Sequence, residues 1–107
     1  MAGPVILTCG EPAGVGPELA VKARQALGAS LPFCWMGDPR HLPVGTALTE
    51  IAHPSEAATV PPDRLPVLRH DFPHPTTPGT PDPANAQGVL DVIARAVALV
   101  KIGRAHV

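Results

Sequence analysis

The nine residues from Gly10 to Glu18, Gly-Glu-Pro-Ala-Gly-Val-Gly-Pro-Glu, decide how this chain begins to fold. The apolar run Val5–Cys9 precedes them and is typical of a buried parallel strand. Three glycines in seven residues allow backbone angles that side chains forbid. After them, apolar residues recur at the spacing of one helical face, at Leu19, Ala20, Ala23, Ala26 and Leu27. The stretch therefore predicts a strand, a tight glycine turn and a helix from Pro17 to about Leu27.

The start of this helix is a candidate anion site. Pro17 suits the first helical position, with Gly16 as N-cap, and free amides at a helix N-terminus favour a negative charge. The spacing G-x-x-x-G-x-G is neither the dinucleotide fingerprint nor a P-loop. A plain turn and a ligand loop therefore both stay open. In the second case the binding residues are Gly10, Glu11, Gly14 and Gly16.

The string Thr8–Glu18 closely resembles the amino-terminal signature of the 4-hydroxythreonine-4-phosphate dehydrogenase family. That family is related to the metal-dependent isocitrate and isopropylmalate dehydrogenases, whose corresponding loop reads G-D-G-I-G-P-E. Two later segments, Pro32–Pro39 and Pro81–Ala86, also look like this family, and the resemblance extends from residue 4 to about residue 100. It implies an α/β fold, a partial three-layer sandwich with a mostly parallel sheet that opens with a βαβ unit.

The resemblance also implies an activity, the NAD- or NADP-dependent oxidation and decarboxylation of 4-phosphooxy-L-threonine in pyridoxal 5′-phosphate biosynthesis. A divalent metal (zinc, magnesium or cobalt) polarises the substrate in that family, and the complete enzyme is expected to be a cytoplasmic homodimer. The family's metal and catalytic residues lie in later motifs, so no metal ligand or catalytic residue is predicted here. A related dehydrogenase acting on another phosphorylated or carboxylated hydroxy acid, and an inert partial domain, remain alternatives.

Composition narrows the class of protein. A chain of 107 residues buries one modest core, and a formal charge of −1 without a basic cluster argues against nucleic acid. No apolar run approaches the roughly 20 residues of a membrane span, and no basic segment typical of a signal peptide opens the chain. Cys9 and Cys34 fall in predicted strands without C-x-x-C spacing, so we expect buried, unreactive thiols.

The middle of the chain offers three further strands, Leu31–Met36, Ala47–Ile51 and Leu65–Leu68. Asp38 is expected to cap a short turn, with a ligand contact as the alternative. Residues 54–83 contain nine prolines and cannot form a regular helix. Within them, Pro73–Pro83 is expected to be extended.

The last predicted helix opens at Pro83, with Asp82 as its cap. Its apolar stripe comprises positions 86, 89, 90, 93, 96, 97 and 100, and is expected to cover a sheet. Charged pairs are expected between Asp91 and Arg95, and between Glu18 and Lys22 on the first helix, which Gly28 should end.

The histidines carry no clear chemistry. His70 and His74 bracket a short segment and suggest a metal pair, but Pro73 excludes a regular helical pair, and loop histidines are usually solvated. His41 and His53 are expected to be solvated in the same way.

The chain closes with Lys101–Val107, and Ile102–Val107 can be encoded by ATC GGA AGA GCA CAC GTC, which matches a common sequencing-adapter sequence. We therefore expect residues 1–100 to be the first part of an α/β dehydrogenase domain. Residues 101–107 are expected to be a non-native tail, and roughly two-thirds of a family-length chain to be missing.

Overall fold

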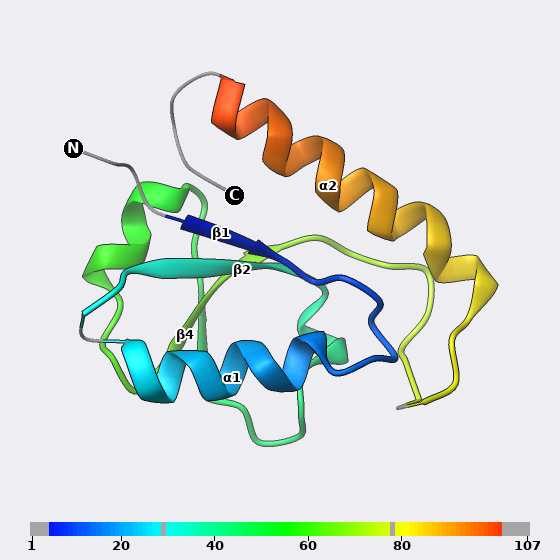
Figure 1. Ribbon diagram of the computed structural model, residues 1–107, viewed down its shortest axis with the longest axis horizontal. Coiled ribbons are helices and arrows are strands. Elements are labelled where there is room, and N and C mark those ends of the chain that lie inside the picture. Colours follow the sequence, from blue (N-terminus) through cyan, green and yellow to red (C-terminus); the bar gives the residue numbers. More distant parts are fainter. Residues whose placement is uncertain (1–4, 29, 78, 102–107) are drawn as a thin grey trace.

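The computed structural model describes residues 5–28, 30–77 and 79–101, which build one parallel four-stranded sheet between two helices (Figure 1). The spatial order is β1-β2-β4-β3, and every neighbouring pair is parallel. In Figure 1 helix α1 lies below the strands and helix α2 above them. The predicted α/β layering is therefore confirmed. The strands are β1 (Val5–Thr8), β2 (Phe33–Gly37), β3 (Leu48–Glu50) and β4 (Leu65–Arg69), and the helices are α1 (Gly16–Leu27) and α2 (Ala86–Lys101).

The βαβ opening is confirmed in detail. Strand β1 pairs with β2 in parallel from Val5–Phe33 to Thr8–Met36. All five residues of β2 are buried, with Trp35 among the largest side chains of the core. A short apolar run of this kind is what a strand with neighbours on both sides and helices on both faces requires.

Helix α1 turns a different face to the sheet from the predicted one. Leu19 and Leu27 are exposed and so is Ala26, whereas Ala23 packs against the core as predicted. The buried face instead carries Pro17, Ala20 and Arg24.

Arg24 explains this rotation, because its guanidinium finds acceptors under the helix. Nε donates to the Arg64 carbonyl at 2.8 Å, and Nη2 donates to the carbonyls of Val60 and Pro61 at 3.1 Å each. A buried cation is tolerated when such partners surround it. A pattern of apolar residues alone does not reveal this arrangement.

The ends of α1 also differ from expectation. Val15, not Gly16, is the residue before the helix. Gly28 has a right-handed φ of −54° and donates its N–H to the Arg24 carbonyl, so it is not a left-handed terminator. The expected pair of Lys22 with Glu18 forms at 3.3 Å.

Helix α2 is rotated as well. Ala96 is fully buried and Val89 packs against the core, as predicted. Val92, which lies outside the predicted stripe, is also fully buried, whereas Leu90 and Ile93 of the stripe are exposed. Asp82 caps as predicted, accepting the N–H of Ala84 at 2.9 Å, but it does so for a 3-10 turn at Pro83–Asn85 that precedes the helix.

The predicted pair of Asp91 with Arg95 does not form. Arg95 Nη1 donates instead to the Arg69 carbonyl at 2.8 Å, and Asp91 accepts from Gln87. The Arg69 carbonyl lies at the end of β4, so this contact forms only because α2 packs against the sheet.

The proline-rich connections are compact. A 3-10 helix, Pro54–Thr59, follows β3, a tighter turn that proline permits at its first position. The segment predicted to be extended, Pro73–Pro83, contains a turn in which the Thr80 N–H donates to the Thr77 carbonyl at 2.9 Å. The predicted non-native tail, residues 101–107, lies outside the described residues, apart from Lys101 at the end of α2.

Candidate functional site

The glycine loop joins the end of β1 to the start of α1 through a tight turn. Gly10 has a φ of +61°, a left-handed conformation that favours glycine. Glu11 closes the turn twice: its carbonyl accepts the N–H of Gly14 at 2.9 Å, and its Oε1 accepts the N–H of Ala13 at 3.1 Å. The Glu11 side chain therefore stabilises the conformation of the loop.

Gly16 lies where a side chain does not fit. A Cβ built there would lie 2.6 Å from the Cys9 carbonyl oxygen, which is backbone and cannot move aside. A Cβ at Gly14 would lie 3.2 Å from the Glu11 carbonyl oxygen, a milder conflict. Gly16 is therefore required for packing α1 against the end of β1, whatever ligand the loop holds.

The first turn of α1 has unsatisfied donors. Within the described part of the chain, the backbone N–H groups of Gly16 and Glu18 have no hydrogen-bond acceptor, and Pro17 has no N–H. The first bond to close the helix runs from the Leu19 N–H to the Val15 carbonyl at 2.9 Å. Such free amides, together with the helix dipole, favour an anion.

A cavity of about 430 Å³ is lined by Glu18, one of the two residues with a free N–H group. The glycine loop and the start of α1 form one wall, and the segment after β2 forms the other. Arg40 contributes a half-exposed guanidinium whose charge is paired with Asp38, and Glu18 contributes a carboxylate that is paired with Lys22. The lining residues are Pro12, Gly14, Pro17, Glu18, Arg40, His41, Leu42, Pro43, Val44 and Thr76.

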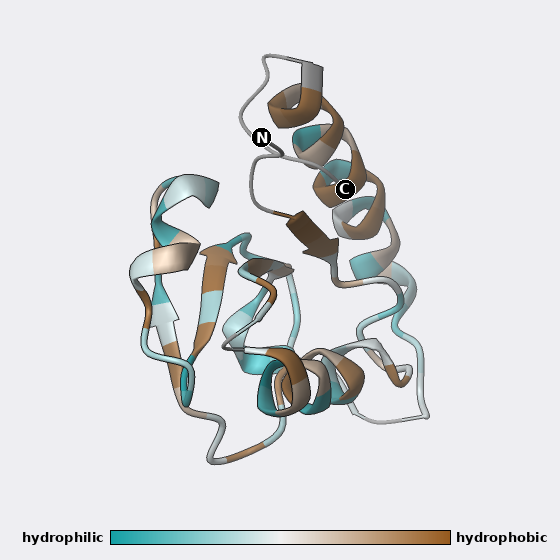
Figure 2. Cartoon of the chain, turned by 60° about the vertical axis from the view of Figure 1, so that its left-hand side comes forward, coloured by the Kyte–Doolittle hydropathy of each residue, from teal (hydrophilic) through white to brown (hydrophobic). Residues whose placement is uncertain are grey.

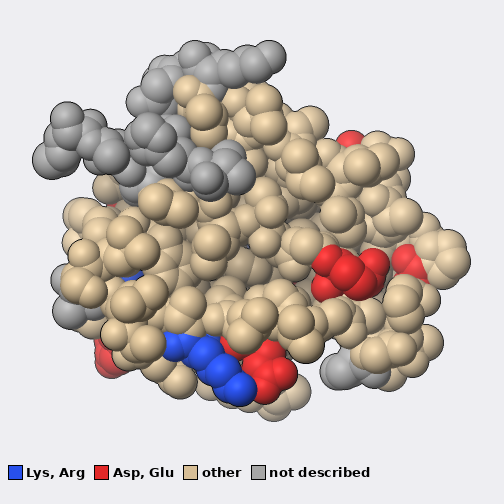
Figure 3. All heavy atoms as spheres, viewed as in Figure 1, with Lys and Arg blue, Asp and Glu red and all other residues tan. Residues whose placement is uncertain are grey.

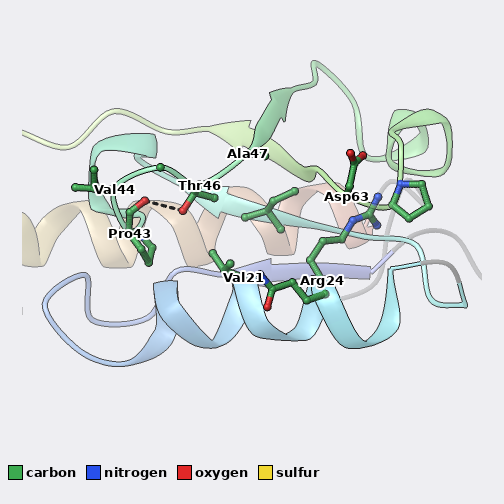
Figure 4. Close-up of a pocket in the computed structure, with 11 residues that line it drawn as sticks. Val21, Arg24, Pro43, Val44, Thr46, Ala47 and Asp63 are labelled. Carbon is green, nitrogen blue, oxygen red and sulfur yellow. Dashed lines mark hydrogen bonds between the residues drawn. The ribbon is translucent and has the colours of Figure 1, made fainter.

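A larger cavity of about 720 Å³ lies on the other side of the segment around Val44 (Figure 4). Val21 and Arg24 of α1 form its floor, facing Thr46, whose hydroxyl donates to the Pro43 carbonyl at 2.6 Å. The smaller cavity, unlike this one, is lined by the N-terminus of α1 with the free N–H of Glu18, so it suits an anion better. We therefore place the candidate site at the glycine loop.

Asp38 organises the wall opposite the glycine loop. Its carboxylate is fully buried at the end of β2 and accepts the N–H groups of Arg40 and Phe72, both at 2.9 Å. Arg40 Nη2 donates both to Asp38 Oδ2 at 2.8 Å and to the Phe72 carbonyl at 2.6 Å, and so links Asp38 to Phe72. Burial raises the pKa of Asp38, but these hydrogen bonds outweigh it and lower the pKa to about 2. The predicted capping role is confirmed, whereas the contact with Phe72 was not foreseen.

His41 is buried, not solvated as predicted, and it holds the segment that follows Phe72. Its Nε2 lies 2.9 Å from the His74 carbonyl oxygen, and its ring packs edge-on against Phe72 at 4.9 Å. Asn85 binds the same backbone, accepting the His74 N–H at 3.1 Å. The segment then reaches the glycine loop, where the Gly79 N–H donates to the Ala13 carbonyl at 2.8 Å.

The remaining histidines and the thiols do not form a reactive centre. In residues 5–28, 30–77 and 79–101, no group of three His, Cys, Asp or Glu side chains is placed to hold a metal ion. His74 contributes its backbone to the fold, and its side chain is exposed. Burial raises the pKa of Cys9 to about 11 and that of Cys34 to about 12, so both thiols stay protonated at neutral pH.

Comparison with protein-family profiles finds no match, but individual proteins match closely. The chain is 61% identical over 102 residues to the 4-hydroxythreonine-4-phosphate dehydrogenase of Roseobacter denitrificans, and 61% identical over 104 residues to that of Paracoccus denitrificans. Over this length the chain is a homologue of the 4-hydroxythreonine-4-phosphate dehydrogenases. The resemblance expected from Thr8–Glu18 is confirmed.

The structure agrees with the sequence match. The crystal structure of the 4-hydroxythreonine-4-phosphate dehydrogenase from Klebsiella pneumoniae superposes with a TM-score of 0.83 at 26% identity, covering 97% of this chain and 35% of that one. The alignment with the Roseobacter dehydrogenase covers 95% of this chain, which spans about 31% of the length of that relative. Neither helix of the described residues has the length and apolarity of a membrane span.

Proposed function

We propose that this chain is part of an NAD- or NADP-dependent 4-hydroxythreonine-4-phosphate dehydrogenase, which oxidises and decarboxylates 4-phosphooxy-L-threonine in pyridoxal 5′-phosphate biosynthesis. The observation that carries the proposal is the 61% identity over 102 residues to a dehydrogenase of that name. The complete enzyme is proposed to be a cytoplasmic homodimer.

Within that enzyme, the glycine loop is proposed to bind a phosphate group, from the substrate or from the dinucleotide. The free N–H group of Glu18 and the guanidinium of Arg40, which is also paired with Asp38, are donors for such an anion at one cavity. The Glu18 carboxylate opposes it, and its ion pair with Lys22 reduces that repulsion. Gly10 and Glu11 contribute by shaping the turn.

The divalent metal implied by the family resemblance has no fitting ligand set among the described residues. We therefore assign no metal ligand in this chain and derive no step through the metal. What these residues supply is one wall of a binding cleft.

Part of a cleft is not expected to catalyse the reaction. Hydride transfer and decarboxylation need the substrate and cofactor held together in a fixed geometry, and losing that positioning costs several kcal/mol of barrier. We propose that the 107-residue polypeptide alone is inactive. A related enzyme that acts on another phosphorylated or carboxylated hydroxy acid is the second candidate, because a helix N-terminus binds anionic groups of many substrates.

The test compares two polypeptides, the 107-residue chain and a joined chain. The joined chain consists of residues 1–101 followed by the part of the Roseobacter dehydrogenase that this chain does not match. With 4-phosphooxy-L-threonine, NAD or NADP and divalent metal, we expect nicotinamide reduction by the joined chain and none by the 107-residue chain. A folded joined chain without activity, beside an active Roseobacter enzyme, would overturn the proposal. A joined chain that prefers another hydroxy acid would favour the second candidate.

The glycine loop is tested in the same joined chain. Gly14→Val places a side chain at the cavity wall, and we expect the KM for the substrate or the cofactor to rise about tenfold or more. Val15→Ala is the matched control, because Val15 is exposed and does not line the cavity. Equal kinetics in the two variants would show that the loop serves only the turn.

A further inference from the structure

His41 has a ring nitrogen that is buried without a hydrogen-bond partner. The residue is 5% exposed, and within the described part of the chain its Nδ1 atom has no donor or acceptor in reach. The other ring nitrogen, Nε2, lies 2.9 Å from the His74 carbonyl oxygen. Buried polar atoms are nearly always hydrogen-bonded, because an unpaired one destabilises the fold. The Nδ1 atom of His41 therefore points to a partner outside the described residues.

The position of His41 indicates what kind of partner this is. His41 lines the cavity of about 430 Å³ at the glycine loop. Among the described residues, the other buried side-chain atom without a partner is Trp35 Nε1, and Trp35 lines neither of the two cavities. Figure 2 shows apolar strands between the two helices, and Trp35 belongs to that interior. Of these two residues, His41 is the one that a small ligand can approach.

The contact with His74 fixes the tautomer of His41. A backbone carbonyl oxygen only accepts, so Nε2 carries the proton and Nδ1 of the neutral ring is an acceptor. A fully ionised phosphate has no proton to donate and cannot pair with that nitrogen. The ligand atom that pairs with Nδ1 is therefore a donor, as a hydroxyl group is.

Other groups at the same cavity are donors for an anion. Arg40, the neighbour of His41, uses Nε and Nη2 for its bonds to Asp38 and Phe72, and its Nη1 makes no hydrogen bond with the described residues. The N–H of Glu18 is free as well, and the Glu18 carboxylate is paired with Lys22. Figure 3 shows basic and acidic atoms side by side over α1. One cavity thus has donors for a phosphate and an acceptor for a hydroxyl.

We propose that His41 is a specificity-determining residue of this cavity, whose Nδ1 accepts a hydrogen bond from a hydroxyl group of a phosphorylated ligand. The phosphate of that ligand lies at the Glu18 N–H and Arg40. The ligand class is a hydroxylated phosphate ester, which includes 4-phosphooxy-L-threonine and the ribose phosphates of NAD and NADP. In each of these, a hydroxyl is the donor nearest to the phosphate. This inference rests on the proposed function, because it concerns the same cavity.

The test uses His41→Gln in the joined chain defined above. The amide nitrogen of glutamine reaches the place of Nε2 and keeps a donor for the His74 carbonyl, but it leaves no acceptor in the place of Nδ1. His70→Gln is the matched control, because His70 also packs edge-on against Phe72, at 5.8 Å, and does not line the cavity.

Two probes with three carbons each separate the hydroxyl contact from the phosphate contact. Propyl phosphate has no hydroxyl group, whereas glycerol 3-phosphate has two. We expect His41→Gln to weaken binding of glycerol 3-phosphate about five- to tenfold and to leave binding of propyl phosphate within about twofold. His70→Gln should leave both affinities within about twofold. Titration followed by NMR measures these affinities and needs no turnover, so it is readable even if the proposed dehydrogenase activity fails.

Steady-state kinetics of the same variants distinguish the two sources of the ligand. A rise of about five- to tenfold in the KM for 4-phosphooxy-L-threonine, with kcat unchanged, would place the substrate at His41. The same rise in the KM for NAD or NADP would place the cofactor there. Unchanged KM values for all three, in an active joined chain, would overturn the proposal.

Nitrogen-15 NMR of the histidine ring provides a readout that a merely structural role would not change. The Nδ1 resonance of His41 should move on addition of glycerol 3-phosphate and stay in place with propyl phosphate. Equal weakening of both probes by His41→Gln would overturn the proposal, because the ring would then contact the phosphate or only support the cavity wall. Failure of the unmodified joined chain to bind either probe would overturn it as well.

Discussion

The two edges of the sheet are built in opposite ways. Strand β3 has three residues, and polar contacts surround it: Arg69 pairs with Glu50 at 2.9 Å, and Arg64 binds Thr49 Oγ1 at 2.8 Å and the Leu48 carbonyl. Strand β1 has four residues, three of them large and apolar, and an apolar helix flank beside it.

The edge at β3 is polar and charged, whereas the edge at β1 is apolar. Short length and charged side chains are the usual means of keeping a sheet edge from pairing, and β3 has both. Strand β1 is only one residue longer, but it has no charged side chain. The two edges of the described sheet therefore differ in their charged side chains and polar contacts.

The largest effect is expected between the edges, at the end of β2. Asp38→Ala leaves the buried N–H of Phe72 unpaired and frees Arg40, so we expect a loss of about 3 kcal/mol in the free energy of unfolding. Asp91→Ala, on the exposed flank of α2, is the control and should cost under about 0.5 kcal/mol. Denaturant unfolding measures both. A small loss would mean that the contacts of Asp38 with Phe72 and Arg40 contribute little to the free energy of unfolding.

The same carboxylate predicts how stability depends on pH. Its pKa is lowered to about 2 in the folded chain, against about 3.9 unfolded, so the stabilisation is complete above pH 4 and is lost as the pH falls through 2. The expected loss is about 2.5 kcal/mol. Urea unfolding from pH 5 to pH 2 should show it, and the Asp38→Ala variant should lack this component. An identical pH profile in that variant would assign the acid transition to other carboxylates.

Two neighbours on α2 compare covered with open surface directly. Val92→Ala removes buried methyl groups and should cost about 2 kcal/mol, whereas Ile93→Ala should cost under about 0.5 kcal/mol in the 107-residue chain. Thermal melting of the two variants side by side is sufficient. Similar losses would show that Ile93 is packed as closely as Val92 in the 107-residue chain.

Loss of the ion pair between Arg69 and Glu50 at β3 should have little effect on the free energy of unfolding. Glu50→Gln removes one of two partners of Arg69, both half-exposed, and should cost about 0.5 kcal/mol or less. The effect should shrink further in 1 M salt, which screens exposed charges. A loss above about 2 kcal/mol would mean that β3 depends on this pair for its place in the sheet.

The sequence by itself determined the elements. The strand Val5–Thr8, the glycine turn and the helix to Leu27 follow from residue patterns that act within a few positions, as do the later strands and the cap at Asp82. The resemblance carried by Thr8–Glu18 is likewise a property of consecutive residues. The binding role of Gly10, Glu11, Gly14 and Gly16 stays a prediction, although the structure shows why Gly10 and Gly16 suit the turn.

Tertiary structure alone decided which face of each helix is buried and how the site is walled. Arg24 reaches carbonyls 36 to 40 residues away, and Asp38 binds Phe72, 34 residues away. Such contacts depend on where loops return, which local periodicity does not encode. An apolar stripe predicts that one face of a helix is buried, but it does not identify the residues that cover that face. On α2, only part of the apolar surface packs against these strands: Val92 and Ala96 are buried, whereas Leu90 and Ile93 are exposed.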